Sequence, residues 1–253
     1  MSTTTESPPP SATALDKSNV RIRKMFGSIA PYYDLLNHLL SLNIDKSWRA
    51  KTVKLVAPVA DHGPILDVCT GSGDLALGYQ KVAQGKIDVV GADFCGPLLD
   101  RACRKAKDPN KKWNKPVRFL QADAQRLPFP SNQFQIVSVA FGLRNVADTN
   151  RGLSEMIRVC KPGGRVVILE FSKPRVKVID KLYLWYFRSV LPRVGQWFSK
   201  SPDAAYNYLP ASVLSFPDYE ELCQRMQSLG LCEVSYHPLT FGVATIYIGK
   251  KSG

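Results

Sequence analysis

Apolar and polar positions follow two different periods along most of the chain. Short apolar runs between turn residues are typical of buried strands, and stretches with apolar residues three or four apart are typical of helices. The predicted strands are 64–68, 87–93, 117–122, 135–140, 165–171, 232–238 and 242–250. The predicted helices that separate them are 74–82, 97–106, 149–159 and 217–229. This alternation indicates an α/β fold with a mostly parallel, twisted sheet and helices on both faces.

Both ends of the chain depart from this alternation. The last two predicted strands follow one another too closely for a crossover helix, which indicates an antiparallel edge strand. Residues 19–59 show helical spacing with a break before Pro31, because a proline disfavours helix in the residue that precedes it. Residues 1–18 are rich in Ser, Thr and Pro and predict a disordered tail. We interpret 19–253 as a single domain that carries an aromatic and basic insert at about 174–208.

Composition adds a strong positive charge to this picture. The chain has 34 Lys and Arg against 21 Asp and Glu, a net charge of +13. This balance favours an anionic partner such as a membrane surface, a nucleic acid or an acidic substrate, although a solvated basic surface explains it equally well. The cysteines form no C-x-x-C pair, which favours free thiols in a reducing compartment. No apolar stretch is long enough to cross a bilayer, and no Cys or His spacing fits a metal, so we expect a cytoplasmic protein without a metal site.

Acidic residues stand at the ends of three successive predicted strands. Asp67 ends the first strand, Asp93 ends the second, and Asp123 follows the third. The first strand runs into the turn Gly71-Ser72-Gly73, whose glycines let the backbone approach a ligand closely. The carboxyl ends of parallel strands meet at one edge of a sheet, so we expect these residues to line one cofactor pocket.

The acid of the first strand decides which cofactor this pocket favours. A carboxylate at Asp67 would repel the pyrophosphate of a dinucleotide, which disfavours a dehydrogenase, and would attract the sulfonium and ammonium groups of S-adenosylmethionine. Asp93 suits the ribose hydroxyls and Asp123 the adenine amine. We therefore predict an S-adenosylmethionine pocket made by Asp67, Gly71, Ser72, Gly73, Asp93, Asp123 and Ala124. The alternative is that the acids only cap the loops and helices that follow them.

Longer motifs give the chain a specific resemblance. They are Tyr33-Asp34-Leu35-Leu36-Asn37 with Ser41 and Trp48, Leu127–Pro130, Phe141–Val146, Arg158–Ser172, Tyr206–Pro210 and Leu239–Gly242. Over about residues 24–249 the chain resembles class I methyltransferases, and within them the quinone-biosynthesis C-methyltransferases of the menaquinone and ubiquinone pathways. It departs from the usual motifs at Cys69 (glycine in many members), Ser72 (threonine), Leu36 (methionine) and Asp45 (histidine).

The resemblance implies a Rossmann-like class I methyltransferase fold and a specific reaction. This reaction is the S-adenosylmethionine-dependent C-methylation of a demethylmenaquinol ring, the last step of menaquinone biosynthesis. A 2-methoxy-6-polyprenyl-benzoquinol of ubiquinone biosynthesis and a phytyl-naphthoquinol share the motifs and stay open as alternatives. A nucleic-acid partner is not expected, because an N-P-P-Y motif is absent and the basic residues are scattered.

Two further groups of residues are candidates for the chemistry of the ring. We predict that Arg144 stabilises the quinol oxyanion and that Asn145 binds the ring oxygen, since their segment follows the fourth strand at the ligand-binding edge. The alternative is that Arg144 pairs with a structural acid and Asn145 caps the next helix. Tyr33, Asp34 and Asn37 lie about one helical turn apart on one face and are predicted to close over the donor as a lid, unless Tyr33 only packs and Asn37 only caps.

The insert at 174–208 combines aromatic residues with Lys and Arg. An amphipathic basic helix of this kind suits a membrane surface or a lid over an apolar pocket, and an ordinary packed helix is the alternative. A polyprenylated quinol lives in the bilayer, so the resemblance implies peripheral association with the inner face of the membrane. An oligomer is compatible with the sequence.

Overall fold

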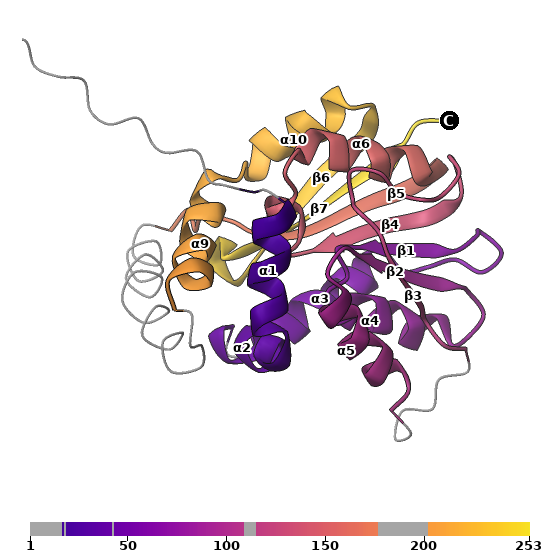
Figure 1. The fold of residues 1–253 in the computed structure, drawn as a ribbon. Helices are drawn as coiled ribbons and strands as arrows, with labels where there is room; N and C mark the ends of the chain where they lie inside the picture. Colours follow the sequence, from indigo (N-terminus) through magenta and orange to yellow (C-terminus); the bar gives the residue numbers. More distant parts are fainter. Residues whose placement is uncertain (1–16, 18, 42, 109–114, 177–201) are drawn as a thin grey trace, which may run out of the picture.

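A computed structural model describes residues 17, 19–41, 43–108, 115–176 and 202–253 (Figure 1). The helices are α1 (Asn19–Ile29), α2 (Tyr33–Leu40), α3 (Ile44–Leu55), α4 (Asp74–Ala83), α5 (Gly96–Ala106), α6 (Thr149–Val159), α9 (Pro202–Ser215) and α10 (Tyr219–Ser228). Short 3-10 helices are η1 (Ala30–Tyr32), η2 (Leu143–Asn145) and η4 (Thr240–Gly242). The predicted tail over 1–18, apart from Lys17, and residues 177–201 of the predicted insert lie outside the described residues.

Seven strands form one sheet with the order β3-β2-β1-β4-β5-β7-β6. They are β1 (Ile65–Val68), β2 (Val89–Asp93), β3 (Arg118–Gln121), β4 (Phe134–Ala140), β5 (Cys160–Phe171), β6 (Leu231–Leu239) and β7 (Ala244–Lys251). The first five strands are parallel to one another, and β7 runs antiparallel to both β5 and β6. The predicted α/β fold with a mostly parallel sheet and an antiparallel edge is confirmed.

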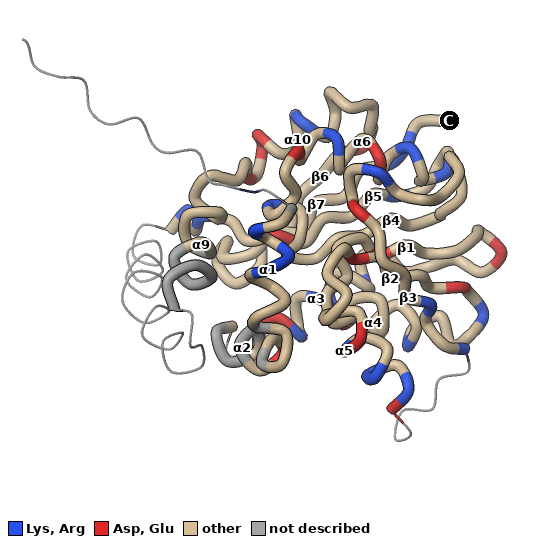
Figure 2. Tube along the Cα trace, viewed as in Figure 1, with Lys and Arg blue, Asp and Glu red and all other residues tan. Residues whose placement is uncertain are grey.

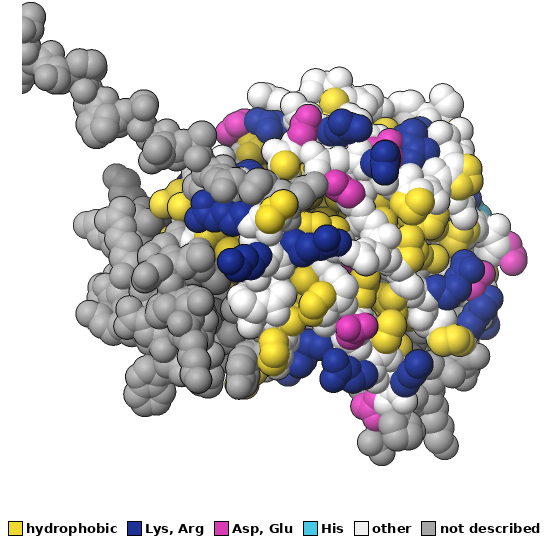
Figure 3. Space-filling model, viewed as in Figure 1, with side chains coloured by type: hydrophobic (Ala, Val, Ile, Leu, Met, Phe, Trp, Pro, Cys, Tyr) yellow, Lys and Arg dark blue, Asp and Glu magenta, His cyan; other side chains and the backbone are white. Residues whose placement is uncertain are grey.

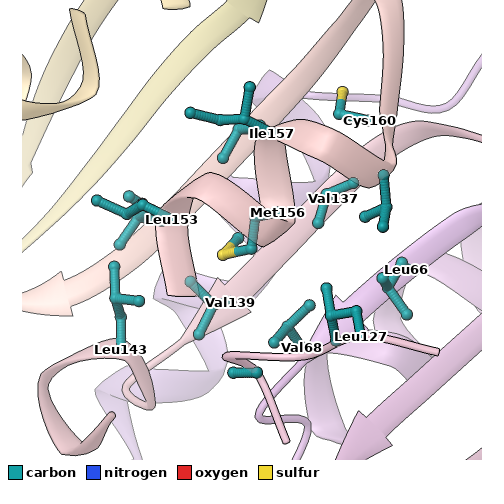
Figure 4. Close-up of a cluster of buried hydrophobic side chains, with 14 of the residues drawn as sticks. Leu66, Val68, Leu127, Val137, Val139, Leu143, Leu153, Met156, Ile157 and Cys160 are labelled. Carbon is teal, nitrogen blue, oxygen red and sulfur yellow. The ribbon is translucent and has the colours of Figure 1, made fainter. Parts of the chain in front are cut away.

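Helices cover both faces of the sheet because its central strands are apolar on both sides. All residues of β1 are buried, as are those of β2. On one face, α6 presents Leu153, Met156 and Ile157 to Val137 and Val139 of β4 (Figure 4). On the other face, α3 and α4 pack against β1, β4 and β5. A parallel sheet sandwiched in this way leaves its strand ends as the natural place for a ligand site.

One predicted boundary is confirmed and another is moved by the structure. The predicted break before Pro31 is confirmed, since α1 ends at Ile29 and η1 follows. The fifth strand begins at Cys160 and not at Arg165, because Cys160 already pairs with Phe134 and the register then shifts before Arg165 pairs with Ile136. None of the described helices is long and apolar enough to cross a membrane.

The chain order of the sheet reverses where β1 lies between β2 and β4. Ligands of open α/β sheets bind outside the carboxyl ends of the strands at such a switch point. In Figure 1, α1, α2 and α9 gather at this end of the sheet, and η2 follows directly from β4. The fold therefore directs attention to the ends of β1, β2 and β4.

Candidate functional site

A cleft of about 580 Å³, a volume that includes its open mouth, lies at this switch point. Residues from α1 and α2, from the turn after β1, from the end of β2 and from η2 line it. Of the predicted site residues, the lining includes Tyr33, Gly71, Asp93, Asp123, Ala124 and Asn145.

The turn after β1 requires its two glycines. Gly71 and Gly73 have φ values of 57° and 85°, in the left-handed region that favours glycine. A Cβ on Gly73 would stand 3.0 Å from Cζ of Phe119. A Cβ on Gly71 would stand 3.5 Å from the hydroxyl of Tyr33. The turn thus brings bare backbone to the floor of the cleft, directly beneath the Tyr33 ring.

Asp93 at the end of β2 is held for a ligand by backbone amides. Its Oδ2 accepts a hydrogen bond from the Gly71 amide at 2.8 Å, and its Oδ1 accepts one from the Cys95 amide at 2.8 Å. Burial raises the pKa of this carboxyl, and the amide bonds act against that shift. Each oxygen has a second lone pair, so a fixed carboxylate in the cleft lining can accept further hydrogen bonds from ligand hydroxyls.

Asp67 at the end of β1 lies behind the turn and outside the cleft lining. Its Oδ2 accepts a hydrogen bond from the Thr70 hydroxyl at 2.6 Å, and its Oδ1 accepts one from the Ser138 hydroxyl at 2.8 Å. Its exposed fraction is 1%, and burial raises its pKa to about 6 against these hydrogen bonds. In this arrangement Asp67 joins the turn to β4. Its predicted contact with the donor stays a prediction.

Asp123 and Ala124 lie beside the cleft in the turn after β3. The Asp123 carboxylate accepts the Gln125 backbone amide at 2.9 Å and its side-chain amide at 3.2 Å. This is the capping role that sequence reasoning left open for the acids. Both residues also line the cleft, so the turn is placed where an adenine edge would lie if the donor binds as predicted.

The lid residues of α2 are partly described. Tyr33 lines the cleft above Gly71 and stacks edge-on against Phe26, with ring centroids 6.1 Å apart. Asn37 lies on α2, and its side chain lies outside the described part of the chain. Asp34, the third residue of the predicted lid, accepts a hydrogen bond from the Ser72 hydroxyl. Ser72 therefore faces α2 and is absent from the cleft lining.

Arg144 lies in η2 and is paired with a buried acid. Its Nη1 is 2.7 Å from Oε1 of Glu170, and it also donates to the Phe141 carbonyl oxygen. Its guanidinium carbon lies 5.3 Å from the centre of the Phe171 ring. Arg144 does not line the cleft, so the pairing with a structural acid is the arrangement found here. A direct contact with a substrate oxyanion would require Arg144 to leave Glu170, and it stays a prediction.

Asn145 is the polar side chain of η2 that reaches the cleft. Its Nδ2 donates to the Phe141 carbonyl oxygen at 3.4 Å. Its Oδ1 is buried and accepts no hydrogen bond from any described residue. A buried acceptor without a partner is costly, so it is usually satisfied by water or by a ligand. Asn145 is thus prepared to accept a hydrogen bond from a hydroxyl in the cleft.

Sequence reasoning missed two sets of polar contacts: Glu170 as the partner of Arg144, and the contacts of Asp34 with Ser72 and Arg101. Glu170 was read as part of an apolar strand, although a single charge within a buried strand signals a buried ion pair. Asp34 was seen as part of a motif, but its cationic partners lie far along the chain. Among the described residues no group of three or more His, Cys, Asp or Glu side chains is arranged to hold a metal ion.

The residues present fit a nucleoside that carries a cationic centre. The cleft offers bare backbone at Gly71, the carboxylate of Asp93 and the unpaired Oδ1 of Asn145, all of them hydrogen-bond acceptors or points of close approach. Among the lining residues that the structure describes none is Lys or Arg, which disfavours a phosphate-rich ligand.

Comparison with known proteins agrees with this chemistry. The sequence profile of the ubiE/COQ5 methyltransferase family matches residues 14–251. The chain is 44% identical to the ubiquinone/menaquinone biosynthesis C-methyltransferase UbiE of Geobacter sulfurreducens, over 94% of this chain and 91% of that protein. It is 47% identical to the demethylmenaquinone methyltransferase of Thermus thermophilus, over 90% of this chain and all of that protein.

Solved structures share the fold at much lower sequence identity. One is an S-adenosylmethionine-dependent methyltransferase of Thermotoga maritima, described as a possible histamine N-methyltransferase, with 18% identity, a TM-score of 0.64, and coverage of 91% of this chain and 100% of that chain. Another is the [4+2]-cyclase SpnF, with 15% identity, a TM-score of 0.65, and coverage of 91% and 96%. The second likeness shows that the fold alone does not determine the reaction.

Proposed function

Because the chain belongs to the ubiE/COQ5 methyltransferase family, we propose that it methylates a ring carbon of a demethylmenaquinol to give menaquinol, the last step of menaquinone biosynthesis. The methyl donor is S-adenosylmethionine, and the chain acts in quinone biosynthesis. The observation that carries the proposal is a switch-point cleft with Asp93 on one side and the unpaired Asn145 on the other, in a chain with relatives named for this reaction.

On the donor side, the chain supplies binding and orientation. We assign the ribose hydroxyls to Asp93, the adenine to the turn at Asp123 and Ala124, and the closest backbone approach to Gly71 and Gly73. Asp67 and Ser72 then act on the donor through the turn, since their side chains bind Thr70, Ser138 and Asp34. When bound, S-adenosylmethionine supplies a methyl group on a positively charged sulfur, which leaves as a neutral thioether.

On the acceptor side, the chain has to favour an electron-rich ring and exclude water. We assign Asn145 Oδ1 to a hydroxyl of the quinol, from which it accepts a hydrogen bond and so increases electron density on the ring. We retain Arg144 as the group that stabilises a developing oxyanion. This role requires its guanidinium to be shared between Glu170 and the substrate oxygen. Holding the ring carbon in line with the methyl group accounts for several kcal/mol of the barrier without any further group.

A second ring is the second candidate. The Geobacter relative is named for both ubiquinone and menaquinone biosynthesis, so a 2-methoxy-6-polyprenyl-benzoquinol is the alternative acceptor. The relatives of Deinococcus radiodurans and Thermus thermophilus are named for demethylmenaquinone alone. Both candidate acceptors are hydroxylated rings that carry a polyprenyl tail.

The experiment that tests the proposal is a methyl-transfer assay with labelled S-adenosylmethionine and two reduced, short-tailed quinones. Transfer to the demethylmenaquinol and not to the methoxy-benzoquinol is the expected result. Transfer to both would extend the proposal to both pathways. Transfer to neither, with S-adenosylhomocysteine still bound, would overturn the assignment of the acceptor.

We further propose that the protein works at the inner face of the cytoplasmic membrane, where its substrate lies. The support is the net charge of +13, which attracts an anionic surface. Figure 3 shows Lys and Arg side chains dispersed over one face between apolar ones, without one continuous basic patch. The protein should sediment with vesicles of phosphatidylglycerol at low salt and stay in solution at high salt. Sedimentation that does not respond to salt would contradict the electrostatic attraction.

A further inference from the structure

The α2 helix is tied to the donor side of the cleft by five charged or hydroxyl side chains, which we call the Asp34 clamp. Its members are Asp34, Ser72, Asp74, Arg101 and Lys105. They come from three places: α2, the turn that leads into α4, and α5. Figure 1 shows α1 and α2 beside α5 at the ligand end of the sheet, and Figure 2 shows charged residues on α2, α4 and α5 there.

Asp34 is the centre of the clamp. Its Oδ1 accepts a hydrogen bond from the Ser72 hydroxyl, and Nζ of Lys105 lies 3.5 Å away. Its Oδ2 is 2.9 Å from Nη2 of Arg101, and Nη1 of the same guanidinium donates to the Pro31 carbonyl oxygen at 2.9 Å. One carboxylate thus fastens the start of α2 to two other elements.

Lys105 completes the clamp on the side of the turn. Its Nζ pairs with Asp74 at the start of α4 and lies 3.2 Å from the Ser72 hydroxyl. The clamp therefore holds two carboxylates and two cations, and its charges balance. Burial opposes ionisation of Asp34, but Ser72, Lys105 and Arg101 outweigh it and lower the pKa of this carboxyl, so Asp34 is ionised at neutral pH.

The position of the clamp gives it a consequence for the ligand. Tyr33 precedes Asp34 and lies over Gly71, while Ser72 follows Gly71, so the clamp joins the cover of the cleft to its floor on either side of the donor site. Because Tyr33 lies within contact distance of Gly71, a donor bound along the glycine turn lies against the edge of the Tyr33 ring, and this side of the cleft opens only when the start of α2 moves. That movement breaks the contacts of Asp34 with Ser72 and Arg101.

We propose that Asp34 is a positioning residue that keeps Tyr33 over the glycine turn and thereby slows the release of the spent donor. This inference rests on the proposed function, since it takes the glycine turn as the place where the donor binds. Because the pairs are only partly exposed to solvent, salt weakens them without abolishing them.

The test measures how fast S-adenosylhomocysteine leaves the full-length protein by stopped-flow fluorescence. Asp34→Asn keeps the size of the side chain and one acceptor oxygen but removes the charge. We expect dissociation about tenfold faster, the effect of losing a charged hydrogen bond. Asp100→Asn on α5 is the matched control, because Asp100 is exposed and makes no ion pair with a described residue. It should change the rate less than about twofold, as surface charges do.

A second readout does not depend on any ligand. Amide hydrogen exchange over residues 19–40 in the free protein should be faster in Asp34→Asn than in Asp100→Asn, while exchange in β4 should be equal in both. Ser72→Ala, which removes the hydroxyl and leaves every charge in place, should change both readouts in the same direction by a smaller factor.

The outcomes separate the clamp from the proposed function. Equal dissociation rates in Asp34→Asn and Asp100→Asn would overturn the positioning role, even if the Asp34 variant were less stable. Failure of the wild-type protein to bind S-adenosylhomocysteine would overturn the donor site, and the clamp as a donor device with it. Binding of S-adenosylhomocysteine without methyl transfer to either quinol would overturn the proposed acceptor and leave the clamp standing.

Discussion

The ends of β2 and β4 border the same cleft, but they satisfy their polar groups differently. At the end of β2, both oxygens of Asp93 accept backbone amides within 2.8 Å. Beyond the end of β4, Arg144 Nε and Asn145 Oδ1 are buried and have no partner among the described residues. On the β2 side, both carboxylate oxygens have hydrogen-bond partners before a ligand binds. On the β4 side, a buried donor and a buried acceptor still have none among the described residues.

The end of β2 is therefore preorganised, whereas the geometry beyond the end of β4 depends on the ligand that binds there. A carboxylate fixed by backbone amides holds its geometry with or without a ligand, so it suits a donor that every turnover requires. Unpaired buried groups cost free energy in the free protein and regain it with a suitable partner.

The largest effect should come from the ion pair on the β4 side. Arg144→Ala leaves the buried carboxylate of Glu170 uncompensated, and losing one partner of such a pair costs about 3–5 kcal/mol. Urea unfolding measures this loss in the free energy of unfolding. The control is the double variant Arg144→Met with Glu170→Leu, which removes both charges and should recover most of the stability.

The same double variant decides what Arg144 does for the reaction. If Arg144 steadies the quinol oxyanion, turnover stays low although the fold is stable again, and binding of S-adenosylhomocysteine stays close to that of the wild type. Recovery of turnover together with stability would contradict the predicted oxyanion contact, and would leave Arg144 as a structural partner of Glu170.

Asp67 should give the next largest effect, because it joins the two sides through Thr70 and Ser138. Its pKa of about 6 in the folded protein exceeds the ordinary value near 4, so the folded state keeps this proton to higher pH than the unfolded state. Stability from this group is therefore lost as pH rises from about 4 to about 6, by roughly 3 kcal/mol at 1.36 kcal/mol per pKa unit.

Asp67→Asn should lack this loss. Urea unfolding at several pH values gives the difference in stability between variant and wild type, which should shift in favour of the variant by about 3 kcal/mol between pH 4 and pH 7. A constant difference over this range would mean that Asp67 ionises at its ordinary pKa and is not buried as the structure has it.

Much of the site follows from topology, which is why the sequence predicted it. The glycine turn, Asp93 and Asp123 come together because parallel strands end at one edge, and that fact needs no knowledge of side-chain contacts. The register between strands is not visible in this way. Asp67 and Asp93 look equivalent in the sequence, but Asp67 is paired in register with Ser138 of β4, whose hydroxyl takes up its carboxylate.

The sequence did not predict the polar pairs between residues that lie far apart along the chain. Arg144 and Asn145 were expected to act together on the substrate, yet Glu170 draws Arg144 away from the cleft and leaves Asn145 in it. Asp34 depends on Arg101, which is 67 residues away. Such pairs form only when helix packing places their elements side by side, so no local pattern announces them.

Asp93 should affect binding of the donor, and also stability, because the single acceptor oxygen of an asparagine cannot serve both the Gly71 and the Cys95 amides. Asp93→Asn removes the charge that accepts the predicted ribose hydroxyls, and hydrogen bonds to a charged group contribute about 2–3 kcal/mol, or roughly a hundredfold in Kd. Calorimetry with S-adenosylhomocysteine measures it. Asp88→Asn is the control, because it removes a half-exposed acid just before β2 that pairs with Lys115. Asn145→Ala on the opposite side should lower turnover while leaving this Kd within about twofold. Equal weakening by the Asp93 and Asn145 variants would break the division into two sides.

The smallest effect concerns the contact between the turn after β1 and the segment after β4. Cys69 follows β1 with a φ of 51°, a left-handed conformation in which many family members have glycine, and a Cβ on Gly142 would stand 2.3 Å from its Cβ. The backbone of Gly142 has a φ of −113°, which any residue adopts, so a side chain there is opposed by Cys69 and, less severely, by Cγ2 of Val139 at 3.3 Å. We expect Gly142→Ala to cost about 2 kcal/mol through overpacking.

Cys69→Gly should relieve that clash, because it removes the atom that the new methyl group meets and also the left-handed strain. By itself it should change stability by less than about 1 kcal/mol, since lost packing and higher entropy of the unfolded chain offset the relief. In the double variant most of the cost of Gly142→Ala should disappear, a coupling of about 1–2 kcal/mol in a double-mutant cycle measured by urea unfolding. Additive effects would show that the turns after β1 and β4 adjust independently, and the donor and acceptor sides would then be joined through Asp67 and Ser138 and not through this contact.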